Sequence, residues 1–291
     1  MFAILGAAGK AGYATATALR AAGKPVRAIL RDPSKAERLA ALGCEIAIAV
    51  LHDTGALLRA FEGAAAVQVI CPTAPRAQNA AGEMHHSIKS VGLALEVVKP
   101  EAVLAISDYG AEIEEGTGIT LLFHALESRL RRLPSRLILL RSAEHMENWA
   151  RVIGPAAETG ALPSLHHPVG KIFPTVSARD VGGIAADLLM ESTSDHISPR
   201  IVHAEGPNRY TSSDVAQALA TLLHRDVAAY ELPRNEWHAT LLRAGTSESA
   251  AYLVTELYDA HNAGRIDAEP GVGEIRRGRI QLEDALRPLV R

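Results

Sequence analysis

Three glycines near the start of the chain have the spacing of a phosphate-binding turn. Gly6, Gly9 and Gly12 follow a short apolar run and open an alanine-rich segment typical of a helix. Glycine at a strand-to-helix turn allows a positive φ, and without a Cβ the backbone can approach a pyrophosphate closely. The helix N-terminus adds free N–H groups and a positive dipole for the anion. The alternative is a tight turn that binds no ligand. The turn predicts a dinucleotide site formed by Gly6, Ala8, Gly9, Lys10, Ala11 and Gly12.

The end of the next apolar run carries basic residues where an NAD-binding site usually carries an acid. That acid normally stands about 20 residues after the glycines and binds the ribose hydroxyls. Here Arg31 occupies this point, Asp32 follows it, and Lys35 lies one helical turn further on. A guanidinium can bind a 2′-phosphate through two hydrogen bonds. NADP(H) is therefore favoured over NAD(H). The alternative is an Arg31 that only pairs with Asp32 or Glu37 at the surface.

The first half of the chain alternates short apolar runs with helical patterns. The runs are almost continuously apolar, as in parallel strands that are buried on both faces. Strands that alternate with helices predict an α/β fold with a Rossmann-type doubly wound parallel sheet. We expect residues 1–150 to form an NAD(P)-binding domain. The expected strands cover residues 2–5, 26–30, 45–50, 65–70, 102–107 and 136–141, and the expected helices cover 10–22, 33–42, 54–61, 81–98 and 121–133.

The alternation becomes irregular after about residue 150. Proline and glycine are frequent between residues 154 and 174. Residues 151–291 are predicted to form a smaller C-terminal α/β lobe on the substrate side, with some segments returning to the sheet. Its expected helices cover residues 180–191, 212–223 and about 235–263, and its expected strands cover 200–205 and about 227–232.

The composition argues against several classes of protein. A net charge of −3 gives no sign of nucleic-acid binding, and no apolar run approaches the roughly 20 residues of a membrane span. The apolar N-terminus is expected to be the first strand and not a signal peptide. Cys44 and Cys71 have no zinc-site spacing and are expected to be buried thiols. We therefore predict a cytoplasmic protein with no metal site, no nucleic-acid partner and no membrane association.

Several segments in order along the chain resemble the NmrA-like branch of the atypical short-chain dehydrogenase/reductases. The likeness covers nearly the whole chain and implies a Rossmann-like sheet with a small C-terminal lobe that binds NADP(H) or NAD(H). Some members of this family reduce quinones or related acceptors, and others sense the cofactor pool by docking on protein partners. The segments are the glycine motif, VRAILRDPSKAERLAALG, HDTGALLRAFEGAAAVQVICP, HALESRLRRL, LILLRSAEHMENW, FPTVSARDVGGIAADLL and HAEGPNRYTSSDVAQAL.

The resemblance also assigns individual residues to the cofactor. Besides the glycine segment, it implies that Arg31 and Lys35 bind the cofactor. It further implies that Cys71 and Pro72 pass near the ribose and that Ser107 lies near the nicotinamide. Relatives usually carry Gly-Asp-Leu after the third strand, whereas this chain has Ala49-Val50-Leu51. Leu51 is thus expected to keep its place at the cofactor, while an aspartate near the adenine is lost.

The Tyr-x-x-x-Lys pair of the wider superfamily is missing from this chain. The resemblance places Thr120 at the tyrosine position and His124 at the lysine position. His124 can donate a proton near neutral pH, Tyr109 can replace the missing phenol, and Asn148 can orient a substrate carbonyl. The alternatives are a purely structural histidine and an Asn148 that only caps the next segment.

Two functions follow from these residues. The first is an oxidoreductase that transfers a hydride from NADPH to a small quinone-like or carbonyl acceptor, because the nicotinamide supplies the hydride and the protein positions the acceptor. The second is a non-catalytic NADP(H)-sensing regulatory protein that binds a protein partner, as the missing tyrosine and lysine suggest. A homodimer is also compatible with the sequence.

Overall fold

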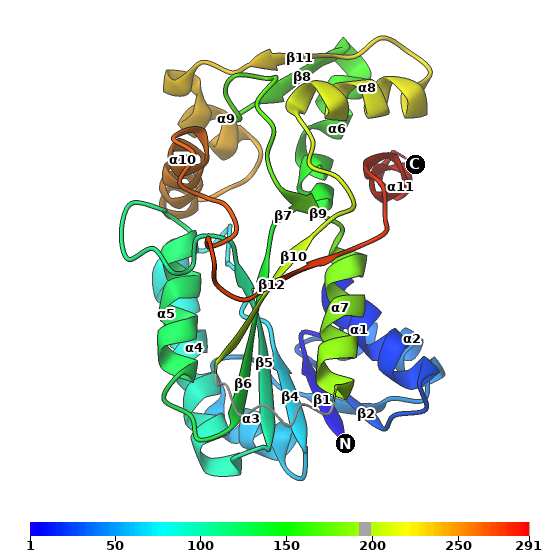
Figure 1. Ribbon diagram of the computed structural model, residues 1–291, viewed down its shortest axis with the longest axis vertical. Helices are drawn as coiled ribbons and strands as arrows, with labels where there is room; N and C mark the ends of the chain where they lie inside the picture. The colour runs from blue at the N-terminus through cyan, green and yellow to red at the C-terminus, as the bar shows by residue number, and fades with distance from the viewer. Residues whose placement is uncertain (192–198, 291) are drawn as a thin grey trace.

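The computed structural model describes residues 1–191 and 199–290, and its centre is a parallel sheet of eight strands (Figure 1). The strands lie in the order β12-β10-β6-β5-β4-β1-β2-β3, and neighbouring strands are parallel. All carboxyl ends therefore lie at one edge of the sheet, which we call the carboxyl edge. The strand order reverses between β1 and β4, which makes this edge a topological switch point. The strands are β1 Phe2–Leu5, β2 Val26–Leu30, β3 Glu45–Ile48, β4 Ala66–Val69, β5 Ala102–Asp108, β6 Arg136–Ser142, β10 Arg200–Glu205 and β12 Glu274–Arg277.

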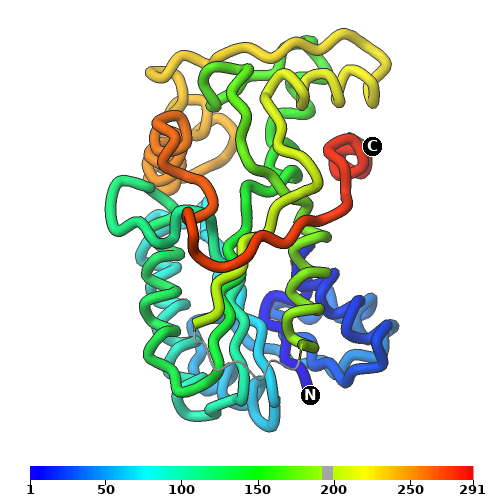
Figure 2. Tube along the Cα trace, viewed as in Figure 1, coloured from blue at the N-terminus to red at the C-terminus, as the bar shows by residue number. Residues whose placement is uncertain are grey.

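Helices cover both faces of the sheet (Figures 1 and 2). One face packs against α1 (Lys10–Ala21), α2 (Glu37–Ala41) and α7 (Ala178–Met190). The other packs against α3 (Thr54–Phe61), α4 (Ala80–Val98) and α5 (Thr120–Leu130).

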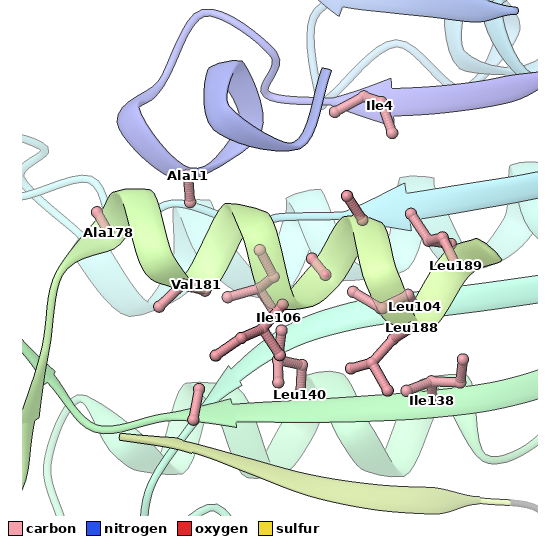
Figure 3. Close-up of a cluster of buried hydrophobic side chains, with 14 of the residues drawn as sticks. Ile4, Ala11, Leu104, Ile106, Ile138, Leu140, Ala178, Val181, Leu188 and Leu189 are labelled. Carbon is pink, nitrogen blue, oxygen red and sulfur yellow. The ribbon is translucent and has the colours of Figure 1, made fainter. Parts of the chain in front are cut away.

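Alternate residues of each central strand enter different hydrophobic clusters. Leu104 and Ile106 of β5 face α7, as Figure 3 shows, whereas Val103 and Ala105 belong to the cluster on the opposite face. The strands are buried on both sides, which explains their continuous apolar sequence. The Rossmann-type doubly wound sheet expected from the sequence is confirmed.

Two expected helices are divided in the structure. The segment 33–42 begins with a 3₁₀ helix, Pro33–Lys35, before α2, because the Asp32 side chain accepts a hydrogen bond from the Ser34 N–H and tightens the first turn. The segment 235–263 contains a 3₁₀ helix (Arg234–Glu236), α9 (Trp237–Arg243) and α10 (Glu248–Asn262). Gly245, with φ of +83°, lies between α9 and α10 and accounts for the break.

The second half of the chain contributes to both parts of the molecule. α7, β10 and β12 join the main body, where β10 and β12 extend the sheet beyond β6. Most of the other elements lie at the far end of the molecule, where β8 and β11 pair in a separate sheet (Figure 1). β7 pairs with β9 between these parts. The remaining elements are β7 Glu144–His145, α6 Ala150–Thr159, β8 Ala161–Ser164, β9 Thr175–Val176, α8 Ser212–Leu223, β11 Ala228–Glu231 and α11 Leu282–Leu286.

Helix α10 connects the C-terminal half to the carboxyl edge. The Ile119 N–H, just before α5, donates to the Leu253 carbonyl at 3.1 Å. The Ser247 N–H donates to the carbonyl of Pro75, in the loop after β4, at 2.8 Å. α10 therefore covers the edge of the sheet between the end of β4 and the start of α5.

Candidate functional site

The glycine turn after β1 is closed in a way that only small residues allow. Gly6 has φ of +75°, and the Gly9 N–H donates to the Gly6 carbonyl at 2.9 Å. A Cβ on Gly12 would lie 2.4 Å from the Gly6 oxygen, and one on Gly182 of α7 would lie 2.3 Å from the Ala11 oxygen. The turn, α1 and α7 are therefore in close backbone contact, and a side chain at Gly12 or Gly182 would separate them.

The N-terminus of α1 fits an anion. Gly9 is its N-cap and provides no side-chain cap, and the first turn of the helix contains no acidic residue. The first N–H groups of a helix have no partner within the helix, so they can bind a pyrophosphate. Lys10 lies exposed at this terminus. The residues present therefore fit the dinucleotide that the glycine spacing predicts.

The basic residues after β2 are exposed and available. Within residues 1–191 and 199–290, neither Arg31 nor Lys35 forms an ion pair with another side chain. Asp32 instead accepts hydrogen bonds from the N–H and hydroxyl of Ser34, which hold the pKa of Asp32 below its usual value. Its carboxylate caps the 3₁₀ helix, so Arg31 is free to bind an anion.

A pocket of about 410 Å³ opens beside the glycine turn, and Arg38 is part of its wall. Its lining residues are Ala8, Ser34, Lys35, Glu37 and Arg38. The Arg38 Nη2 donates to the Ala8 carbonyl at 2.5 Å, and the guanidinium lies 4.4 Å from the centre of the Tyr13 ring. Arg38 was not among the residues predicted from the sequence. Arg38 lies three residues after Lys35, and two residues at this spacing lie on the same side of a helical segment. This spacing could have identified Arg38 as a second basic residue beside Lys35.

The residues expected along the rest of the cofactor differ in accessibility. Leu51 is half-buried and Pro72 is exposed, so both are accessible to a ligand. Cys71 is buried, and burial raises the pKa of its thiol to about 12. Ser107 is also buried, and its hydroxyl donates to Oε1 of Glu127 on α5 at 2.7 Å. The Ser107 hydroxyl is therefore bound to the Glu127 carboxylate in this structure.

The three side chains expected to take part in catalysis make contacts with different parts of the fold. The Tyr109 hydroxyl is buried and donates to Glu205 of β10 at 3.2 Å. Burial and the charge of Glu205 raise the pKa of Tyr109 well above its usual value. His124 Nδ1 lies 2.9 Å from the Ala111 carbonyl. Asn148 is exposed in the 3₁₀ helix Met146–Trp149.

Acidic side chains that the sequence analysis did not select meet at the carboxyl edge. Asp108 ends β5, and its Oδ2 accepts a hydrogen bond from the hydroxyl of Thr120, the first residue of α5, at 2.7 Å. Glu144 follows β6 and is held by Nε2 of His166 at 2.8 Å and by the Tyr258 hydroxyl at 2.9 Å. The available signal was an acidic residue at the end of one buried strand and two residues beyond the end of the next.

These two carboxyl groups have pKa values shifted in opposite directions. Burial has the largest effect on Asp108, and together with the negative charges of Glu144 and Glu112 it raises the pKa of Asp108 to about 7. The hydrogen bond from Thr120 lowers this pKa but does not outweigh them. Burial also disfavours the Glu144 carboxylate, but His166, His261 and Tyr258 together outweigh burial and lower the pKa of Glu144 to about 2. Separated pKa values in neighbouring carboxyl groups mark an acid and a permanent anion.

A second pocket, of about 290 Å³, lies on the α5 side of the sheet, where His124 is one of the lining residues. Its floor is the buried Arg141, whose Nε and Nη2 each donate to a Glu127 oxygen at 2.9 Å. The Arg141 Nη1 donates to Glu112 at 2.8 Å and to Glu269 at 2.5 Å. This network satisfies the buried guanidinium and fixes α5 to β6, which is a structural role.

Two further features are absent from residues 1–191 and 199–290. No group of three or more His, Cys, Asp or Glu side chains there is arranged to hold a metal ion. In the same part of the chain, no helix is long and apolar enough to cross a membrane.

Comparisons with known proteins agree with this geometry. Residues 6–125 match the family model described as NAD(P)H-binding. The NAD(P)H azoreductase of Xenophilus azovorans is 22% identical over 94% of this chain and 92% of its own length. An NADPH-dependent quinone oxidoreductase from Escherichia coli, solved with NADPH, has a TM-score of 0.80 at 20% identity over 100% of both chains. The structure of an NmrA double mutant has a TM-score of 0.71 at 14% identity, covering 98% of this chain and 94% of that one.

The comparisons establish the binding domain and the fold. The N-terminal part of the chain is an NAD(P)H-binding domain, as the glycine turn predicts. The expected likeness to NmrA is confirmed at the level of the fold, because NmrA and the quinone oxidoreductase share it along almost their whole length.

Proposed function

We propose that this NAD(P)H-binding protein is an oxidoreductase that uses NADPH to reduce a small quinone-like or carbonyl acceptor by hydride transfer. The observation that carries the proposal is the continuity of two features along the carboxyl edge. An anion-binding turn lies after β1, and after β2 lie Arg31 and Lys35, which form no ion pair within the described residues. A pair of carboxyl groups with separated pKa values lies at the end of β5 and after β6. The likeness to an NAD(P)H azoreductase and to an NADPH-dependent quinone oxidoreductase supports reduction of a small acceptor, and the second supports a quinone-like one.

The residues of the first feature would hold the cofactor. The N-terminus of α1 would bind the pyrophosphate, and Arg31, Lys35 and Arg38 would surround a 2′-phosphate. Arg38 would also keep α2 against the glycine turn through its bond to Ala8. Oδ1 of Asp32 accepts both hydrogen bonds from Ser34, so only Oδ2 would be left to bind a ribose hydroxyl of NAD. This arrangement supports NADP(H) over NAD(H).

The residues of the second feature would act on the acceptor. A bound reduced nicotinamide supplies the hydride. The protein must then orient the acceptor, exclude water and supply a proton at the atom that becomes negative. Tyr109 would have to leave Glu205 before it could protonate an acceptor. His124 is bound to the Ala111 carbonyl through Nδ1, and its Nε2 lies 3.4 Å from the Ser128 hydroxyl, so Nε2 is the nitrogen that could protonate an acceptor. Asn148 is exposed and could contact an acceptor without breaking such a bond.

The cofactor half of the proposal is tested by fluorescence titration with NADPH and with NADH. We expect Arg31→Ala and Lys35→Ala each to weaken NADPH binding about 10-fold, the loss of one charge-assisted hydrogen bond, and to leave NADH binding nearly unchanged. Arg132→Ala is the matched control, since Arg132 is exposed just after α5 at the opposite edge of the sheet. Equal losses for NADPH and NADH would contradict the assignment of the 2′-phosphate site.

The catalytic half is tested by following NADPH oxidation with a panel of quinones, azo dyes and aromatic aldehydes. Steady turnover with one of these classes would identify the acceptor. Tight NADPH binding with no oxidation by any of them would contradict the reductase. It would favour instead a protein that senses NADP(H) and binds a protein partner.

A further inference from the structure

We infer that Asp108 is the group that protonates the acceptor, an inference that rests on the reductase function proposed above. Asp108 ends β5, which is separated from β1 by β4 alone. Neighbouring strands lie about 4.8 Å apart, so Asp108 lies roughly 10 Å along the edge from the glycine turn. In open α/β sheets the ligand lies in the crevice outside these carboxyl ends. Asp108 is partly exposed there, whereas Ser107 beside it is buried.

The contacts of Asp108 come from the elements that surround this edge. The Thr120 hydroxyl of α5 donates a hydrogen bond to Oδ2 of Asp108 at 2.7 Å. Glu144 approaches from β7, because Asp108 pairs with Ser142 at the end of β6. Glu112, in the turn that follows β5, is the other acidic neighbour, and its carboxylate is bound to Arg141.

Glu144 keeps the proton on Asp108. His166 and Tyr258 both donate to Glu144, so its negative charge is stabilised in the fold. Two carboxylates close together cannot both ionise easily, so the proton is held by the carboxyl group whose neighbours stabilise a negative charge less. Burial and these negative charges accordingly raise the pKa of Asp108 to about 7. At neutral pH a large fraction of Asp108 is therefore a carboxylic acid, which is the form that a general acid needs.

The proton step balances without any further reactant. The acceptor gains two electrons and one hydrogen as a hydride from the reduced cofactor, and one of its oxygen or nitrogen atoms becomes negative. The O–H bond of Asp108 breaks as a new O–H or N–H bond forms on that atom. The Asp108 carboxylate then regains a proton from water, because its side chain is partly exposed. Thr120 and Glu144 act through Asp108 and are positioning residues.

The first test measures kcat against pH with NADPH and 2-methyl-1,4-naphthoquinone. For the wild type we expect kcat to fall as the pH rises through about 7, when Asp108 loses its proton. Asp108→Asn should lower kcat about 100-fold at pH 6, remove this pH dependence and leave NADPH binding unchanged. Glu114→Gln, on the exposed loop after β5, is the control that should keep the wild-type profile.

Two neighbouring substitutions should move the midpoint of the pH profile in opposite directions. Thr120→Val removes a hydrogen bond that lowers the pKa of Asp108, so the midpoint should rise. Glu144→Gln removes a negative charge that raises it, so the midpoint should fall. A side chain that only supports the fold would not produce these opposite shifts, and the pair tests the inference even where Asp108→Asn folds poorly.

A readout without cofactor completes the test. The infrared spectrum of the wild type minus that of Asp108→Asn should show the C=O band of a protonated carboxyl that disappears with a midpoint near pH 7. A wild type that reduces no acceptor would overturn the reductase and this inference with it. An active wild type whose activity and pH profile survive Asp108→Asn would overturn the role of Asp108 alone and leave the reductase intact.

Discussion

Replacing Asp108 by asparagine should make the protein more stable above pH 7 and leave its stability nearly unchanged near pH 4. The folded carboxyl has a pKa of about 7, against 3.8 when it is unperturbed. The folded state therefore holds a proton that the unfolded state releases between these values. Stability falls with rising pH wherever the folded state binds more protons, so the wild type loses stability from about pH 4 to pH 7.

The size of this loss follows from the shifted pKa. The difference corresponds to roughly 4 kcal/mol of unfolding free energy, at 1.36 kcal/mol for each tenfold change in proton affinity. Asp108 is partly exposed, and water screens part of the interaction, so about 2 to 4 kcal/mol is the expected range. Asparagine keeps an oxygen that can accept from Thr120 and carries no charge against Glu144. The variant should therefore avoid the whole loss.

Thermal unfolding of the protein without cofactor, followed by circular dichroism from pH 4 to pH 9, measures the effect. At about 2 °C for each kcal/mol, the Tm of Asp108→Asn should exceed that of the wild type by about 4 to 8 °C at pH 8. Asp32→Asn is the control, because Ser34 holds the pKa of the exposed Asp32 below its usual value. Stability from Asp32 is lost only as the pH falls, so the difference in Tm between Asp32→Asn and the wild type should stay constant between pH 6 and pH 9. Parallel curves for Asp108→Asn and the wild type would refute the reasoning.

Three other substitutions or treatments test the packing. Gly182→Ala places a Cβ 2.3 Å from the Ala11 oxygen and should lower the free energy of unfolding in urea by about 1 to 3 kcal/mol. A Cβ on Gly183 of the same helix would meet nothing within 4 Å, so Gly183→Ala should stabilise the protein by up to about 1 kcal/mol. Similar values for both would contradict close contact of α1 and α7. Burial raises the pKa of Cys71 to about 12, so mass spectrometry should find it unmodified by iodoacetamide at pH 8 until urea unfolds the protein. Glu127→Gln leaves part of the buried Arg141 charge uncompensated, so the free energy of unfolding should fall by about 3 kcal/mol. A fall below about 1 kcal/mol would argue against this network.

The sequence by itself determined the features that depend on neighbours along the chain. A continuous apolar run indicates a strand buried on both faces, and the spacing of the glycines indicates a turn with positive φ. The strand Val26–Leu30 and the helices Thr54–Phe61 and Ser212–Leu223 have the bounds that their patterns predict. The same local information placed the dinucleotide turn, because the strand, the turn and the helix N-terminus are consecutive.

The sequence could not determine which distant side chains meet. Arg38 reaches the Ala8 carbonyl across 30 residues, and Tyr258 reaches Glu144 across 114 residues. Tyr109 looked available for catalysis in the sequence, but its hydroxyl is bound to Glu205, 96 residues away. No local period records such contacts, because they depend on the order of strands in the sheet and on the path of α10.

The tertiary structure also decided the electrostatics of the carboxyl edge. Asp108 and Glu144 are ordinary carboxyl groups in the sequence, with similar unperturbed pKa values of 3.8 and 4.5. Only the fold buries them beside each other and gives Glu144 the donors His166 and Tyr258. Burial and neighbouring charge act through space and not along the chain, so the fold alone assigns the acid and the permanent anion.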